Sequence, residues 1–219
     1  MIFKNRREAG RQLARALIKQ GFKGKNTLVL GIPRGGLVVA DEVAKALFAT
    51  LDVVIARKLR APYRPELGIG AVVDGGHIVL NEQVVRSVGV SQDYLNREIV
   101  YQKGEVERRL RFYRGDHPAP EVAGKTVIVV DDGIATGYAF RASLESLRQR
   151  HPVRLVAATP VAAHDSAEML KAFADEVVCL HMPVSFFAVG AWYKNFDQTS
   201  EEEAVSILRR NWSSLPLAA

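Results

Sequence analysis

Two adjacent carboxylates directly follow an unbroken apolar run in the segment VIVVDDGIATGYAF, residues 127–140. Burying a carboxylate costs several kcal/mol unless the group is paired or hydrogen-bonded. Asp131 and Asp132 therefore need hydrogen-bond donors or a cation close to them. Sugar hydroxyls, which donate hydrogen bonds, and a divalent cation are the two kinds of partner that suit such a pair.

The loop after the pair has the composition of an anion site. Residues 133–137, GIATG, are mostly small, and a helix is predicted to begin near Tyr138. Backbone N–H groups converge at a helix N-terminus and bind phosphates, while Thr136 adds a hydroxyl and Gly137 allows close approach. The segment therefore predicts a phosphate site beside a site for sugar hydroxyls or a cation. An acidic turn that caps a helix is one alternative. A response-regulator receiver is another, although its acidic pair follows the first strand and this one follows roughly the third.

The rest of the chain alternates between strand-like and helix-like segments. The strand-like runs carry apolar residues at consecutive positions, as strands covered on both faces do. This alternation predicts an α/β fold, an open parallel sheet flanked by helices, whose ligands bind at the carboxyl ends of the strands. The strand-like runs are 27–32, 51–58, 125–132, 153–162 and 175–180, and the helix-like segments are 35–47, 139–149 and 165–174.

Three stretches lie outside this alternation. Residues 3–20 have the apolar spacing of an amphipathic helix docked on the fold. Residues 59–76 contain two prolines and four glycines, which predicts that part of the segment is a long mobile loop. Residues 91–113 are predicted to be a helix within a helical insertion near 82–118, and its charged side chains fit a solvated face.

Length and composition limit the class of protein. The 219 residues, 48% of them hydrophobic, suit a single domain spanning residues 1–219 with a core of about 25–180. No apolar run approaches the ~18 residues of a membrane span and no signal peptide is evident, so we expect a cytoplasmic protein without a membrane partner. The net charge of +6 permits a nucleic-acid partner, but no nucleic-acid-binding motif is present and a small polyanion is expected instead. The single cysteine, Cys179, lies in an apolar run and is predicted to be an inert core thiol.

The pattern of residues 127–140 as a whole resembles the signature of type I phosphoribosyltransferases that binds phosphoribosyl pyrophosphate (PRPP). The resemblance implies that Asp131 and Asp132 hold the ribose 2′- and 3′-hydroxyls. It also implies that five residues wrap the 5′-phosphate, namely Ala135, Thr136, Gly137, Tyr138 and Ala139. Many members have Thr or Ser at the position of Ala139, so one hydroxyl contact is absent here while the backbone donors remain.

Two further segments are similar to the pyrophosphate-binding parts of that family. GIPRGG, residues 31–36, resembles the pyrophosphate loop, in which Arg34 supplies charge and Gly35 and Gly36 let backbone amides reach the leaving group. ARK, residues 56–58, places Arg57 and Lys58 where the family often holds basic residues for pyrophosphate. By the same resemblance, residues 59–70 correspond to a flexible lid.

Residues 181–200 correspond to the small C-terminal hood of the family. FAVG, residues 187–190, resembles the FVVG of hypoxanthine-type members, which implies that Phe187 stacks on a base and the Ala188 backbone recognises its edge. Trp192 is a second candidate for base binding, and aromatics in such a place are also commonly packing residues. The combined motifs are most similar to a bacterial branch of uncharacterised, predicted phosphoribosyltransferases.

The resemblance implies displacement of pyrophosphate from C1 of PRPP by a nitrogen acceptor, as in nucleobase salvage. Arg34, Lys58 and Mg²⁺ would stabilise the departing pyrophosphate, with Mg²⁺ held indirectly by Asp131 and Asp132 through PRPP and water. Purine-type members commonly have a carboxylate at the position of Ala135, and ATG here is similar to uracil-type members, whereas the hood is similar to hypoxanthine-type members. The base therefore stays open, and so does the oligomeric state, for which a homodimer is one option.

An alternative from a different class is a PRPP-binding regulatory protein without catalysis. Such members usually carry a separate DNA-binding domain, and the segment before the first predicted strand is too short for one. They also tend to lose the lid and its basic residues, whereas this chain keeps both. We therefore expect an enzyme that binds PRPP and a small nitrogenous acceptor.

Overall fold

The main sheet consists of five parallel strands in the order β2-β1-β6-β7-β8. The computed structural model describes residues 2–24 and 26–214 of the chain. The strands are β1 (Thr27–Gly31), β2 (Thr50–Val53), β6 (Thr126–Val130), β7 (Arg154–Val161) and β8 (Glu176–His181). The predicted open parallel sheet is confirmed.

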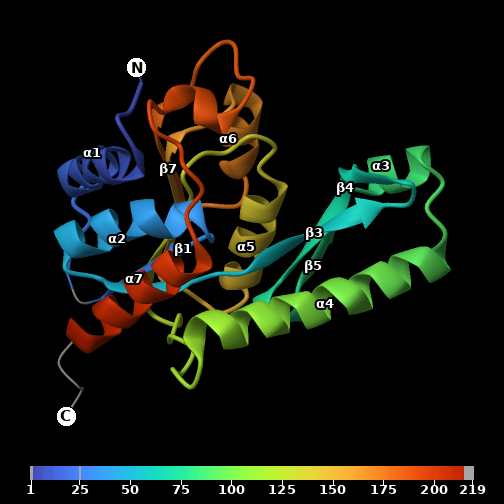
Figure 1. Cartoon of the computed structure of the whole chain (residues 1–219), viewed down its shortest axis with the longest axis horizontal. Helices are drawn as coiled ribbons and strands as arrows, with labels where there is room; N and C mark the ends of the chain where they lie inside the picture. The colour runs from blue at the N-terminus through green and yellow to red at the C-terminus, as the bar shows by residue number, and fades with distance from the viewer. Residues whose placement is uncertain (1, 25, 215–219) are drawn as a thin grey trace.

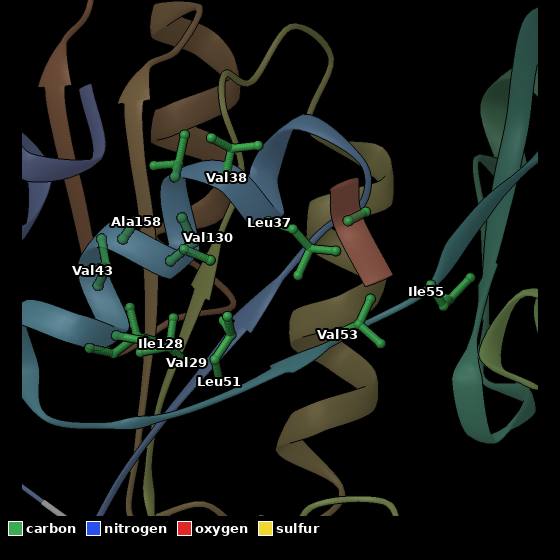
Figure 2. Close-up of a cluster of buried hydrophobic side chains, with 14 of the residues drawn as sticks. Val29, Leu37, Val38, Val43, Leu51, Val53, Ile55, Ile128, Val130 and Ala158 are labelled. Carbon is green, nitrogen blue, oxygen red and sulfur yellow. The ribbon is translucent and has the colours of Figure 1, made fainter. Parts of the chain in front are cut away.

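Helices cover both faces of this sheet (Figure 1). Strand side chains alternate between the two faces, so Val29, Leu51 and Ile128 lie together beneath α2, as Figure 2 shows, while Leu28 and Val127 face α5. All five side chains are fully buried. Burial on both faces explains why the strands are apolar at consecutive positions. One face carries α1 (Arg6–Lys19), α2 (Gly35–Leu47) and α7 (Glu201–Ser214), and the other carries α5 (Tyr138–Arg148) and α6 (His164–Leu170).

Residues 56–114 form an arm that projects from the main sheet, with α4 running alongside its strands (Figure 1). Its antiparallel sheet has the order β3-β4-β5, so the predicted single strand 51–58 is in fact divided between two sheets. The predicted helix over 91–113 is confirmed as α4, with Ser91 as its N-cap. The arm comprises β3 (Ala56–Ala61), β4 (Arg64–Val73), the 3-10 turn η1 (Asp74–Gly76), β5 (Ile78–Leu80), α3 (Glu82–Ser87) and α4 (Gln92–Arg114).

The prediction of a long loop within residues 59–76 is wrong, because most of this segment is a β-hairpin. Leu59 and Ile69 are fully buried at its base, whereas Tyr63 at its turn is fully exposed. The two glycines of β4 occur where neighbours approach closely: a Cβ on Gly68 would lie 3.1 Å from the Lys58 side chain, and one on Gly70 would collide with the carbonyl of Val79 on β5. Glycine here serves close strand packing rather than loop flexibility.

The N-terminal segment and the predicted hood, residues 181–200, pack on each other. The Phe3 N–H donates to the Trp192 carbonyl (2.8 Å), and the Lys194 N–H donates to the Phe3 carbonyl (2.8 Å). The hood contains one short 3-10 helix, η2 (Val189–Trp192).

The apolar side of α1, including Leu13, is buried, which confirms the predicted docked helix. No helix within residues 2–24 and 26–214 is long and apolar enough to cross a membrane.

Candidate functional site

The carboxyl ends of β2, β1 and β6 lie side by side and bring three predicted segments to one edge. Gly31, the last residue of β1, pairs with Val53 on one side and Val130 on the other. Beyond them, the Ile32 N–H donates to the Val130 carbonyl (2.9 Å), and the Val54 N–H donates to the Gly31 carbonyl (3.1 Å). The loop after β1, the chain leading to β3, and the Asp131–Asp132 pair therefore leave the sheet together. This edge is where ligands of open α/β sheets bind.

Gly35 and Gly36 touch the two carboxylates. A Cβ on Gly36 would lie 2.8 Å from Oδ1 of Asp131, and one on Gly35 would collide with Oδ2 of Asp132. Any larger residue at either position would displace a carboxylate. The predicted pyrophosphate loop and the predicted ribose-binding pair are thus brought into direct contact. The same glycines open α2, whose N-terminal dipole favours negative charge nearby.

Asp132 is paired with Arg6, a residue that sequence reasoning missed. Arg6 Nε lies 2.6 Å from Asp132 Oδ2, and the two side chains are only 11% and 14% exposed. Arg6 Nη1 also donates to the Asp197 carbonyl (2.7 Å), and its guanidinium stacks 3.8 Å from the centre of the Phe196 ring. The Tyr193 hydroxyl donates to the Asp132 carbonyl. Arg6 therefore links α1, the hood and the acidic pair.

Asp131 has a strongly perturbed environment. Burial is the largest cause that raises the pKa of Asp131 well above its ordinary value, and the neighbouring charge of Asp132 is the second. The Asp132 N–H, which donates to Asp131 Oδ1 (2.8 Å), acts in the opposite direction. A carboxylate in this state gains from any added donor or cation. Within the described part of the chain, no cluster of three acidic, histidine or cysteine side chains could hold a metal alone. A cation here would need oxygens from a ligand and water in addition to the pair.

The predicted phosphate loop surrounds the start of α5. Gly137 has φ of 72°, a left-handed conformation that favours glycine, and it directly precedes the helix. Ala135 and Thr136 are exposed, and the Ser166 hydroxyl anchors the loop by donating to the Ala135 carbonyl (2.6 Å). Among the described residues, no side chain caps this helix start. The first-turn N–H groups are therefore available to an anion.

The next two residues of the predicted phosphate loop, Tyr138 and Ala139, form the first turn of α5. Asn81 Nδ2 donates to the Tyr138 hydroxyl (2.7 Å), so this side chain is turned toward the arm. The Ala139 carbonyl accepts from the Ser143 hydroxyl (2.9 Å) within the helix. Both residues can thus contribute backbone N–H groups to the loop without using their side chains.

The three predicted basic residues occupy different surroundings. Arg34 immediately precedes α2 and lines a cavity of about 310 Å³ together with Gln198, Ser200, Glu201 and Glu202. Arg57 faces α4, where its Nε donates to Gln102 Oε1 (3.1 Å). Lys58 is exposed on the hairpin, and its Nζ donates to the Glu66 carbonyl (2.8 Å) rather than to the acidic pair. The structure brings Arg34 to the strand edge but holds Lys58 on the arm.

The predicted base-binding residues differ in their exposure. The Phe187 ring is 93% exposed and Ala188 is also exposed, so neither is used for packing. Trp192 is half-buried with its ring edge-on to His181, at 4.8 Å between ring centres. A Cβ on Gly133 would collide with Val189, which places the hood directly on the loop after Asp132. Phe187 is therefore available for a ligand, whereas Trp192 packs against His181.

Comparison with known proteins identifies the family. Residues 2–194 match the family model described as "Phosphoribosyl transferase domain", and the chain therefore belongs to this family. Two Mycobacterium tuberculosis proteins, provisionally named phosphoribosyl transferases, are 44% identical over 210 residues, which are 95% of this chain and 47% of theirs. The chain thus spans about half the length of these curated relatives. The predicted family membership is confirmed.

Solved structures agree with the fold. The crystal structure of TT1426 from Thermus thermophilus is 44% identical, superposes with a TM-score of 0.82, and is matched over 96% of this chain and 99% of its own. A hypoxanthine phosphoribosyltransferase from Staphylococcus aureus is more distant, with 12% identity and a TM-score of 0.48 over 82% of this chain and 76% of its own. The parallel sheet with its flanking helices is therefore the fold of a phosphoribosyl transferase domain, and TT1426 shares it over almost the whole chain.

Proposed function

We propose that this protein transfers the phosphoribosyl group of PRPP to a nitrogen acceptor and releases pyrophosphate. The observation that carries the proposal is the meeting of three elements at one sheet edge. These are the Asp131–Asp132 pair, the Gly35–Gly36 backbone packed against both carboxylates, and the uncapped start of α5 behind Gly137. Membership of the phosphoribosyl transferase domain family supports the same chemistry.

In the proposed reaction, the bond from C1 to the pyrophosphate oxygen breaks and a bond from C1 to the acceptor nitrogen forms. The acceptor nitrogen loses its proton to water, and the pyrophosphate departs with the electron pair of the broken bond, so negative charge grows on it. The protein's contribution is position and electrostatics. Asp132, held by Arg6 through Oδ2, and Asp131 accept hydrogen bonds from the ribose hydroxyls, and residues 135–139 bind the 5′-phosphate. Arg34 and the backbone of Gly35 and Gly36 stabilise the leaving group, and the exposed Lys58 side chain joins them when it leaves the Glu66 carbonyl.

Mg²⁺ fits this site as a metal shared with the substrate. The acidic pair supplies two carboxylates, of which one oxygen already binds Arg6, and Mg²⁺ commonly combines few carboxylates with phosphate oxygens and water. Asp131 and Asp132 would hold it indirectly, through PRPP and water. When bound, the ion would neutralise charge on the pyrophosphate.

A planar nucleobase is the acceptor that the hood supports best. The Phe187 ring offers an exposed aromatic face, and such faces stack on bases of any sequence. The Ala188 backbone lies beside it to recognise a base edge, and Trp192 is a secondary contact. A role in nucleobase salvage in the cytoplasm would follow. The exposed Ala135 offers no carboxylate to a purine, so uracil-type and hypoxanthine-type bases both belong in the test.

The test is a panel of nucleobases with PRPP and Mg²⁺, followed by pyrophosphate release. Release that depends on one base or a small group of bases supports the proposal. PRPP binding without turnover of any base would instead favour a PRPP-binding regulatory protein. A protein that neither binds PRPP nor releases pyrophosphate would contradict both.

A further inference from the structure

One face of α4, in the helical insertion, packs on β3, the strand that follows the edge where the proposed pyrophosphate site lies. Gln102, Val106, Arg109 and Tyr113 are spaced to share this face. Gln102, Val106 and Tyr113 are buried, and Gln102 holds the guanidinium of Arg57 on β3 at 3.1 Å. The face that carries Arg109 therefore packs toward the residues that follow β2.

Two polar groups on this face have no hydrogen-bond partner among the residues that the structure describes. They are Arg109 Nε and the Tyr113 hydroxyl, and both atoms are buried. Tyr113 as a whole is 1% exposed. Buried polar groups are nearly always hydrogen-bonded, and an unpaired one is destabilising, so each such exception requires a physical reason. A ligand that arrives with acceptor oxygens would supply the missing partners.

Positive charge is concentrated around these two groups. The pKa of Arg57 is lowered first by burial and then by the charge of Arg109. Burial raises the pKa of Tyr113, and the charges of Arg109 and Arg34 oppose that rise. Arg109 therefore lies near Arg57 on β3, and Arg109 and Arg34 both lie near Tyr113.

The nearby carboxylates compensate this charge only in part. Glu105 lies close enough to favour the charged form of Arg57, but both of its oxygens bind Arg108, at 3.0 Å each. Glu201, at the start of α7, is the acidic group near Tyr113 that raises its pKa, and Glu201 and Glu202 share the cavity that Arg34 lines. Three guanidinium groups beside buried donors are typical of a site for a phosphate-rich anion.

We propose that the helical insertion completes the pyrophosphate site, with Arg109 and the Tyr113 hydroxyl joining Arg34 and Arg57 as ligands of the pyrophosphate group. The inference rests on the proposed function for the identity of the substrate. It assigns a binding role to a segment that otherwise only supports the hairpin. It also explains why the buried Nε of a partly exposed arginine is held without a partner.

The proposal is tested by comparing the wild type with Arg109→Met in calorimetric titrations with inorganic pyrophosphate and Mg²⁺. We expect a loss of affinity of about 10- to 100-fold, the effect of one charge-assisted hydrogen bond. Tyr113→Phe removes one hydroxyl and should weaken binding about 2- to 10-fold. The control is Arg111→Met, an exposed arginine of the same helix, which should bind as the wild type does.

A second ligand separates a local effect from a general one. Ribose 5-phosphate shares the ribose and 5′-phosphate of PRPP but lacks the pyrophosphate, so Arg109→Met should bind it normally. Equal losses for ribose 5-phosphate and pyrophosphate, or an unchanged affinity for pyrophosphate, would overturn the inference. The thermal stability of ligand-free Arg109→Met should equal or exceed that of the wild type, because the change removes an incompletely paired buried group. A clear loss of stability would assign Arg109 a structural role instead.

The two proposals can fail separately. If the wild-type protein binds PRPP and turns over a base but Arg109→Met keeps its full affinity for pyrophosphate, only the role of the insertion is wrong. If the wild type binds pyrophosphate through Arg109 but neither binds PRPP nor turns over any base, the anion site stands and the proposed function fails.

Discussion

Replacing Arg6 by methionine should destabilise the protein strongly. The change removes a cation whose ion pair with Asp132 is 2.6 Å long and largely buried on both sides. It leaves Asp132 beside Asp131 without a positive partner, and it removes the stacking on Phe196 and the bond to the Asp197 carbonyl. Removing one partner of a buried pair costs about 3–5 kcal/mol. Both side chains keep some exposure, so the lower end, about 3 kcal/mol, is expected.

Urea unfolding of wild type and Arg6→Met measures this free energy from the shift in midpoint at constant slope. In a thermal melt, the same loss should lower Tm by about 6–12 °C for a chain of this size. The matched control is Arg11→Met on the same helix. The Arg11 side chain is 52% exposed and lies 3.4 Å from Glu42, so its loss should stay within about 0.5 kcal/mol.

A double variant tests whether the destabilisation comes from the uncompensated carboxylate. Arg6→Met combined with Asp132→Asn removes both charges, and it should recover much of the stability that Arg6→Met alone loses. If Arg6→Met stays within 0.5 kcal/mol of wild type, or if the double variant is no more stable than the single one, the pairing of Arg6 with Asp132 is wrong.

Three further changes have defined outcomes. Burial raises the pKa of Asp131 in the folded protein. The protonated carboxyl group therefore adds to the stability of the folded protein below about pH 4, and this contribution is lost as the pH rises through the raised pKa. The advantage of Asp131→Asn over wild type in Tm should therefore grow from pH 4 to pH 8, and a constant difference would refute the shift. Burial raises the pKa of Cys179 to about 11, so a thiol reagent at pH 8 should label it only after unfolding, and rapid labelling of the folded protein would contradict this. Lys58→Ala should lower turnover roughly 10- to 100-fold with little change in PRPP affinity, and a fully active variant would exclude Lys58 from leaving-group stabilisation.

Local patterns predict the strand edge well, because its elements are short and contiguous. The apolar run before Asp131, the small residues up to Gly137 and the helix after them follow one another in the sequence. The register of β1 with β6 then brings the segment containing Gly35 to the same edge. Parallel strands with right-handed crossovers leave few other arrangements.

The arm and the Arg6 contact could not be predicted in the same way. Gly68 and Gly70 suggested a loop, whereas the Lys58 side chain lies over one and β5 packs against the other. Which face of β3 carries Arg57 depends on where the strand begins, since side chains alternate. Arg6 lies 126 positions from Asp132 in the sequence, and an amphipathic pattern shows which side of a helix is buried but not which distant carboxylate its first turn meets.

Calorimetric titration of PRPP in the presence of Mg²⁺ tests the central claim most directly, namely that the acidic pair and residues 135–139 bind a phosphorylated ribose. The wild-type chain should bind one PRPP. The variant carrying both Asp131→Asn and Asp132→Asn should bind about 100-fold more weakly or worse, because two hydrogen bonds to charged groups are lost. Asp165→Asn, a change at a fully exposed carboxylate, serves as the control and should leave affinity unchanged. No binding to the wild type, or equal affinity in the double variant, would contradict the assignment of this site.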